Sequence, residues 1–232
     1  MDLKQVLGDL DKDSYIDILS NLIGEAKFIQ NNPPELIPEE DRVGKHVMDV
    51  LVPYSTSIGG PLIINHVSYV KGRGNIIVEY PGSDEDKVVS FVGSHMNVVP
   101  ANPYQWVCTQ FVHLGYFDPF SLSIDGDKLH GRGTTDRLGH VALLTELMKG
   151  LAEKKPKLKS IVVVVFIVNA ENSIISGFGV DQLLEDRYLD RLKQGPLYWI
   201  DTADKQPCIG NVGYKLYGTT DGSIQSDPVT VL

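Results

Sequence analysis

An uninterrupted apolar run of eight residues, at 161–168, constrains the fold more than any other feature of the sequence. The run is rich in Val and Ile, which favour strands, and it is far shorter than the roughly 20 residues that a membrane helix needs. Side chains alternate between the two faces of a strand, so an all-apolar strand is buried on both faces of its sheet. The chain is therefore expected to cover a sheet with helices on both sides.

The rest of the chain alternates helical and extended patterns around this strand. A helix is expected at 13–30, with Ser14 as its cap, and another is expected to follow 37–41 and to run through Leu51 until Pro53. Further helices are expected at 138–151 and 180–193. Further strands are expected at 62–70, 74–80, 88–93 and 197–200. Trp199, in the last of these strands, is expected in the core. This alternation predicts an α/β fold with three layers (αβα) and a mostly parallel central sheet.

Composition excludes several classes of protein. The 232 residues include 30 acidic and 21 basic side chains, a net charge of −9, which argues against a nucleic-acid binder that relies on bulk positive charge. No apolar segment is long enough to predict a membrane span. Residues 1–13 contain four aspartates and no apolar run, so no targeting signal is expected and a cytoplasmic location is predicted. Cys108 and Cys208, the two cysteines of the sequence, are interpreted as free thiols.

Side chains of the kind that bind metals follow four of the expected strands or hairpins. They are His95, Asp136, Glu171 and Asp201. In open α/β sheets, functional groups gather beyond the carboxyl ends of the strands. One imidazole and three carboxylates form a donor set suited to zinc or a similar ion. On spacing alone, a metal site and ordinary capping or loop roles remain open alternatives.

Four motifs carry a resemblance to a known family. They are Gly-Ser-His-Met-Asn-Val-Val-Pro at 93–100, Gly-Arg-Gly-Thr-Thr-Asp at 131–136, Ala-Glu-Asn-Ser at 170–173 and Trp-Ile-Asp-Thr-Ala-Asp at 199–204. Together they resemble the metallopeptidase family M20, and within it the plant-type acetylornithine deacetylases. The resemblance runs in order from residue 31 to residue 207.

The resemblance implies a metal-dependent hydrolase that releases acetate and ornithine from N-acetylornithine in arginine biosynthesis. His95, Asp136 and Asp201 would hold one Zn²⁺ or Co²⁺ ion. Asp136 would bridge to a second ion, held by Glu171 and by a histidine late in the chain. The metals would polarise the amide and activate water, while a glutamate moves the proton to the leaving amine. The implied partner is a small N-acetyl amino acid.

The chain departs from the family motifs at several positions. Ala170 stands where the resemblance places the glutamate that acts as general base, so impaired catalysis is expected. Asn97 replaces the carboxylate that orients His95, and its side-chain oxygen is expected to accept the ring N–H. Arg137 brings a cation beside Asp136, which opposes metal binding unless the side chain points to solvent. His140 is the last histidine of the sequence, so the second metal site is expected to be incomplete.

The resemblance implies a partial M20-like catalytic domain at 1–210, expected to be incomplete at its C-terminal side, and the residues at 211–232 are expected to form an irregular tail. Residues 107–116 are interpreted as an insertion. The leading hypothesis is an impaired deacetylase. The alternative is a non-catalytic remnant that binds metal or associates with itself through uncovered sheet edges. A Rossmann-type nucleotide binder is disfavoured, because no Gly-x-Gly-x-x-Gly run follows a strand.

Overall fold

The computed structural model describes residues 8–101, 118–170, 175–199, 213–218 and 224–229. Contacts divide the chain into one unit at 1–202 and a second at 203–232. The domain expected at 1–210 stays a prediction. The expected insertion and both cysteines lie outside the described residues.

A five-stranded sheet forms the centre of the first unit, in the order β1-β2-β6-β3-β7. Its strands are β1 (Ile63–Val70), β2 (Arg73–Tyr80), β3 (Val88–His95), β6 (Ile161–Ile167) and β7 (Leu197–Trp199). β2 is antiparallel to β1 and β6, whereas β3 is parallel to β6 and β7. Four of these five strands thus run in the same direction, which confirms the mostly parallel sheet. A separate hairpin pairs β4 (Ser123–Asp125) with β5 (Lys128–His130).

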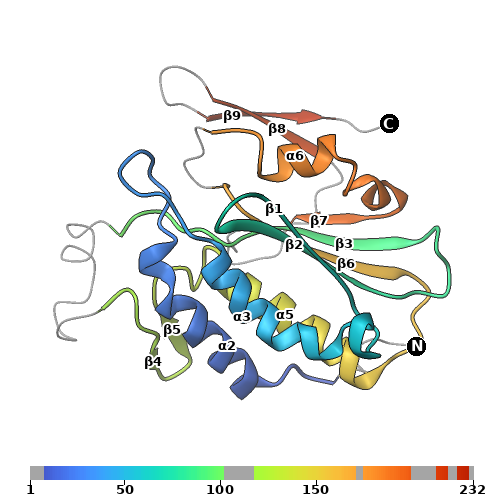
Figure 1. The fold of residues 1–232 in the computed structure, drawn as a ribbon. Helices are drawn as coiled ribbons and strands as arrows, with labels where there is room; N and C mark the ends of the chain where they lie inside the picture. Colours follow the sequence, from blue (N-terminus) through green and yellow to red (C-terminus); the bar gives the residue numbers. More distant parts are fainter. Residues whose placement is uncertain (1–7, 102–117, 171–174, 200–212, 219–223, 230–232) are drawn as a thin grey trace. The chain divides into compact units, whose positions relative to one another are not determined.

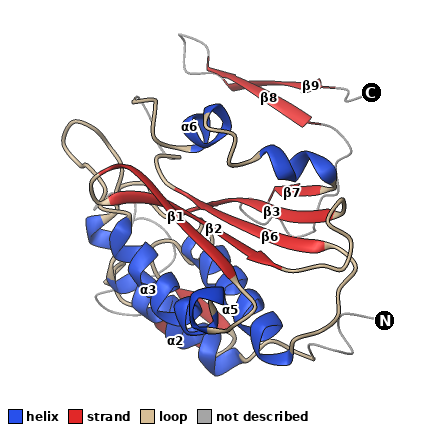
Figure 2. Ribbon diagram, turned by 45° about the vertical axis from the view of Figure 1, so that its right-hand side comes forward, coloured by secondary structure: helices blue, strands red, loops and turns tan. Residues whose placement is uncertain are grey.

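Helices cover both faces of this sheet (Figure 1). One face carries α2 (Lys12–Gly24), α3 (Asp41–Leu51) and α5 (Leu138–Lys154), and the other carries α6 (Val180–Glu185) and the 3-10 helix η4 (Asp190–Gln194). Three shorter 3-10 helices are η1 (Ala26–Phe28), η2 (Val52–Tyr54) and η3 (Thr56–Ile58). The three layers are also distinct in the turned view of Figure 2. The predicted three-layer α/β fold is therefore confirmed.

The central strand β6 explains why this architecture forms. All seven of its residues are buried. Val162, Val164 and Phe166 belong to the core shared with α2, α3 and α5, while the alternate residues pack in a second core with Leu183 and Leu192. Each face of the strand thus meets its own helical layer, as the apolar run predicted.

Three local expectations were wrong. α2 is capped by Asp11, whose side chain accepts hydrogen bonds from the Asp13 and Ser14 amides, and Ser14 instead donates to Glu146 at 2.7 Å. The expected helix at 180–193 is interrupted, because Arg187 adopts a left-handed φ of 65° between α6 and η4. Trp199, expected in the core, is 57% exposed, since β7 lies at the edge of the sheet.

The second unit also differs from expectation. The tail at 211–232, expected to be irregular, contains the antiparallel strands β8 (Gly213–Gly218) and β9 (Ile224–Val229). β8 includes two tyrosines and a leucine, residues that favour strands. The Gly, Ser, Asp and Pro residues between and within the strands obscured that signal in the sequence. Among the described helices of the chain, none is both long and apolar enough to cross a bilayer.

Candidate metal centre

His95 is placed at the carboxyl end of β3 by an irregularity in that strand. The register between β3 and β6 shifts between Phe91 and Ser94, where Gly93 adopts a φ of 89°. This conformation is rarely adopted by residues with a Cβ, so glycine is required there. Such bulges redirect side chains at the ends of strands. His95 pairs with Ile167 as the last residue of β3, and its side chain is buried.

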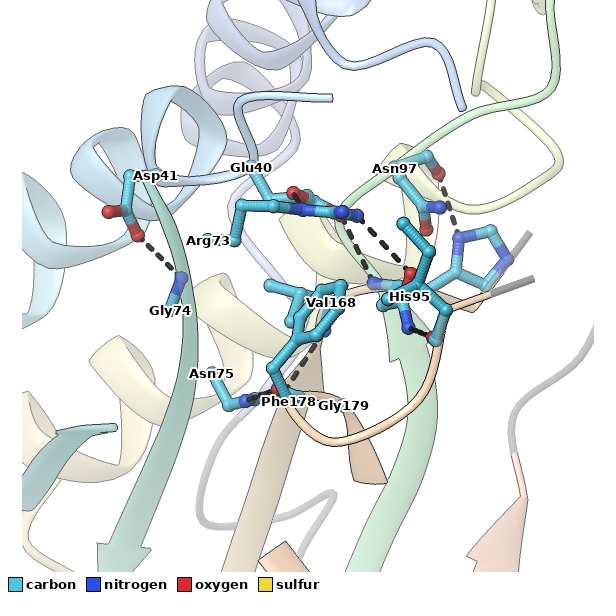
Figure 3. A network of polar contacts seen from close by, with 12 residues as sticks. Glu40, Asp41, Arg73, Gly74, Asn75, His95, Asn97, Val168, Phe178 and Gly179 are labelled. Atoms are coloured by element: carbon cyan, nitrogen blue, oxygen red, sulfur yellow. Dashed lines mark hydrogen bonds and ion pairs between the residues drawn. The ribbon is translucent and has the colours of Figure 1, made fainter. Parts of the chain in front are cut away.

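The His95 ring is oriented by Asn97, but not in the way the sequence suggested. Its Nδ1 lies 2.8 Å from the Asn97 backbone carbonyl oxygen, so Nδ1 carries the proton and Nε2 is the nitrogen available to a metal (Figure 3). The expectation that the Asn97 side-chain oxygen would accept this proton is wrong. The backbone carbonyl of Asn97 accepts this hydrogen bond instead, because Asn97 is only two residues away along the same turn.

The loop before α5 brings Asp136 to His95. Gly133 in this loop has a φ of 95°, and a Cβ there would approach Leu138 Cγ to 2.6 Å. Only glycine therefore lets the loop close against the start of α5. The result is a distance of 3.4 Å between His95 Nε2 and Asp136 Oδ1. The contact with His95 and the charge of Arg137 lower the pKa of the Asp136 carboxyl against the opposing influence of burial.

Arg137 is a third member of this cluster. Its side chain is buried rather than turned to solvent. Nε lies 3.1 Å from Asp136 Oδ1, and Nη1 donates to the Gly93 carbonyl oxygen at 2.8 Å. Because the Arg137 side chain does not point to solvent, its positive charge is expected to oppose metal binding. A permanent cation shares the carboxylate oxygen that also faces His95.

Two further polar side chains lie buried around His95. Ser94 Oγ and both polar atoms of the Asn97 side chain have no hydrogen-bond partner among the described residues. Buried polar atoms of folded proteins normally have a partner, such as water or a bound group. These atoms belong to residues that flank His95 in the chain.

The structure describes two of the four predicted ligands. His95 and Asp136 come together and present one nitrogen and one ionised oxygen, which fits two ligands of a zinc-type ion. Glu171 and Asp201 lie outside the described residues. No group of three potential ligands occurs within the described part. Ala170 is described and exposed, directly after the turn that follows β6.

A polar network beside this centre was missed in the sequence. Glu40 and Arg73 form a buried ion pair that also contacts Asn169, next to Ala170 (Figure 3). Their positions, before a helix and at the start of a strand, are typical of exposed residues. The available sequence signal was the pairing of opposite charges near two element boundaries, which does not predict burial.

Comparisons with known proteins identify relatives of this chain. The model of peptidase family M20/M25/M40 matches residues 91–216. The chain is 66% identical over 212 residues to an acetylornithine deacetylase of Arabidopsis thaliana, covering 91% of this chain and 46% of the relative. It is 47% identical over 221 residues to an acetylornithine deacetylase of Dictyostelium discoideum, covering 91% and 47%. The chain thus spans about half the length of these curated relatives.

Among solved structures, human carnosine dipeptidase 1 has a similar fold. Its TM-score with this chain is 0.61 at 17% sequence identity, and the match covers 86% of this chain and 41% of the dipeptidase. At this identity the similarity concerns the fold alone. It supports the three-layer architecture derived above.

Proposed function

Because the chain belongs to peptidase family M20/M25/M40, we propose that it is a metal-dependent amide hydrolase of the acetylornithine deacetylase type. Its substrate would be N-acetylornithine, and its products ornithine and acetate. The contact between His95 Nε2 and Asp136 Oδ1 is the observation that carries this proposal. The sequence similarity to two acetylornithine deacetylases supports the choice of substrate.

His95 and Asp136 would hold a zinc or cobalt ion together with Asp201, and Asp136 would bridge to a second ion at Glu171. The bound metal supplies Lewis-acid polarisation of the amide and a lowered pKa for water. The chain contributes the orientation of these ligands. Asn97 holds the His95 ring through its backbone carbonyl, and the lowered pKa of Asp136 keeps its carboxylate ionised at neutral pH.

Turnover is proposed to be slow because of Ala170. At the position that the resemblance assigns to the general base, a methyl group accepts no proton. Loss of a positioned acid or base typically lowers a rate by about 10² to 10⁴. The position itself is accessible, since Ala170 is exposed. Restoring a carboxylate there is therefore a direct way to test the proposed catalytic role.

The test combines a zinc titration with a deacetylation assay on N-acetylornithine. We expect zinc-dependent turnover that is lost in Asp136→Ala and increased about 10²- to 10⁴-fold in Ala170→Glu. Turnover that persists unchanged in Asp136→Ala would contradict the proposed centre. The same assay with Arg191→Met, which alters an exposed side chain paired with Glu79, controls for general effects of substitution.

A second candidate is a non-catalytic remnant that binds metal or associates with another copy of itself. The exposed apolar side chains of the edge strand β7 favour this candidate. Zinc binding without turnover in either the original chain or Ala170→Glu would support the remnant over the enzyme.

A further inference from the structure

Arg137 joins the two segments that carry His95 and Asp136. Its Nη1 donates to the Gly93 carbonyl oxygen at 2.8 Å, in the irregular end of β3 that leads to His95. Its Nε donates to Asp136 Oδ1 at 3.1 Å, in the loop before α5. Gly93 and Arg137 are 44 residues apart in the sequence. One guanidinium thus fastens the loop before α5 to the end of β3.

The Arg137 side chain makes these contacts while it is shielded from water. It is 8% exposed, whereas the Asp136 side chain is 34% exposed. A charge that is removed from water needs an opposite charge and hydrogen-bonding groups close by. Asp136 supplies the opposite charge, and the Gly93 carbonyl supplies an uncharged acceptor. The guanidinium and the carboxylate therefore compensate each other's charge within the chain.

A metal ion at the candidate centre would make a connection of the same kind. Held by His95 and Asp136, it would also join the end of β3 to the loop before α5. It would place its charge beside Asp136 Oδ1, which lies 3.4 Å from His95 Nε2 and 3.1 Å from Arg137 Nε. Two cations beside one carboxylate oxygen repel each other. The ion and the guanidinium are therefore alternatives at this oxygen.

We propose that Arg137 is a built-in cation that takes the structural role of the ion when no metal is bound. Binding of an ion would displace the guanidinium from Asp136, and release of the ion would let it return. The ion-bound side of this exchange rests on the proposed function, whereas the metal-free side rests on the contacts of Arg137 alone. Arg137 is a positioning residue, because it acts through Asp136 and Gly93.

This exchange predicts a fold that depends little on the metal. A bound ion normally stabilises the chain that holds it, so a chelator lowers the thermal midpoint. Here the chain itself supplies the positive charge beside Asp136 and the link to Gly93. Part of the binding free energy of an ion would be spent on breaking the contacts of Arg137. The original chain is therefore expected to gain little stability from Zn²⁺.

The decisive variant is Arg137→Met, measured first in the chelator EDTA. Its thermal midpoint should lie about 3 to 6 °C below that of the original chain, because the link between the two segments is lost. Zn²⁺ at about ten times the variant's dissociation constant should raise this midpoint by about 4 °C. At the same Zn²⁺ concentration the original chain, with an affinity about tenfold weaker, should gain about 1 °C. Exchange of the Gly139 amide, which donates to the Gly133 carbonyl oxygen at 3.0 Å, should be faster in the variant in EDTA and slow again with Zn²⁺.

The matched control is Arg42→Met, which breaks another contact between an arginine and a carboxylate, that of Arg42 with Glu25 at 2.6 Å. Its midpoint should fall less, since Arg42 is 39% exposed, and Zn²⁺ should raise it no more than it raises that of the original chain. A second variant, Arg137→Lys, keeps the charge but lacks the fork that reaches two acceptors. Its midpoint in EDTA should lie between those of Arg137→Met and the original chain.

The outcomes separate this inference from the proposed function. An unchanged midpoint of Arg137→Met in EDTA would overturn the inference, and so would a lowered midpoint that bound Zn²⁺ does not restore. If neither the original chain nor Arg137→Met binds Zn²⁺, the proposed function fails. The midpoints in EDTA then decide alone whether Arg137 fastens the loop to β3, with a lowered value supporting this and an unchanged value overturning it. Should Arg137→Met not fold at all, the midpoint of Arg137→Lys decides in the same way.

Discussion

At the scale of single residues, a metal ion at the candidate centre would compete with Arg137 for one carboxylate oxygen. Asp136 Oδ1 lies 3.4 Å from His95 Nε2 and 3.1 Å from Arg137 Nε. The first contact is what a shared metal ion requires, and the second places a fixed positive charge where the ion would bind. Attraction between opposite charges at this distance is strong even in a partly hydrated site. Arg137 is therefore expected to lower the metal affinity of the centre.

Replacement of Arg137 by Met should tighten Zn²⁺ binding by about tenfold or more, because the competing cation is removed while a side chain of similar length remains. Isothermal titration with Zn²⁺ measures the change. Arg137→Lys, which retains the charge, serves as the control and should bind Zn²⁺ much as the original chain does. Unchanged or weaker binding by Arg137→Met would show that the guanidinium does not oppose the ion.

At the scale of elements, charged contacts connect α2 and α3, two of the helices that cover one face of the sheet. Glu25, at the end of α2, accepts a hydrogen bond from Arg42 of α3 at 2.6 Å, and His46 Nε2 lies 3.5 Å from its other oxygen. Burial by itself would raise the pKa of Glu25, but the hydrogen bonds and charges of Arg42 and His46 hold it below its ordinary value. The contact joins two helices that both cover the same face of the sheet.

This lowered pKa predicts a dependence of stability on pH. Because the pKa of Glu25 is lower in the folded chain, its contribution is fully present above its ordinary pKa of 4.5 and is lost as pH falls through the folded value. Glu25→Gln should cost about 0.5 kcal/mol at pH 7, a figure reduced for the partial exposure of Arg42. Urea unfolding of the original chain and of Glu25→Gln, at pH 7 and at pH 3, measures the difference in their free energies of unfolding. This difference should be smaller at pH 3. An equal difference at both pH values would contradict the assignment.

At the scale of the whole molecule, the sheet of the first unit ends at an apolar edge. Leu197, Tyr198 and Trp199 of β7 are each about half exposed, and β3 is the only described strand that pairs with β7. Edge strands with unpaired backbone groups and apolar side chains are templates for pairing with another chain. The second unit, with β8 and β9, is a separate two-stranded sheet.

Self-association through β7 is therefore expected in solution. Sedimentation velocity should detect oligomers whose share rises with protein concentration. Trp199→Lys should shift the distribution towards monomer, because a charge at a sheet edge opposes strand pairing. Ile124→Lys, at an equally exposed apolar residue of the β4–β5 hairpin, is the matched control and should leave the distribution unchanged. A chain that is monomeric at every concentration would rule out this association.

The sequence by itself determined the architecture and the identity of the candidate ligands. The apolar run of β6 dictated burial on both faces, because periodicity and hydrophobicity are properties of a local segment. The positions of His95 and Asp136 after expected strands or hairpins likewise indicated them as candidate ligands. These features depend on residues close together in the chain.

Only the tertiary structure decided which distant groups meet. The buried contacts of Arg137 with Gly93, and those of Glu40 with Arg73 and Asn169, join segments up to 129 residues apart. The exposure of Trp199 depends in the same way on which strand ends the sheet. A sequence shows which side chains are charged, but packing between elements sets their burial and their partners. Burial and partners decide whether a charged side chain stabilises the fold, positions another group or competes with a bound ion.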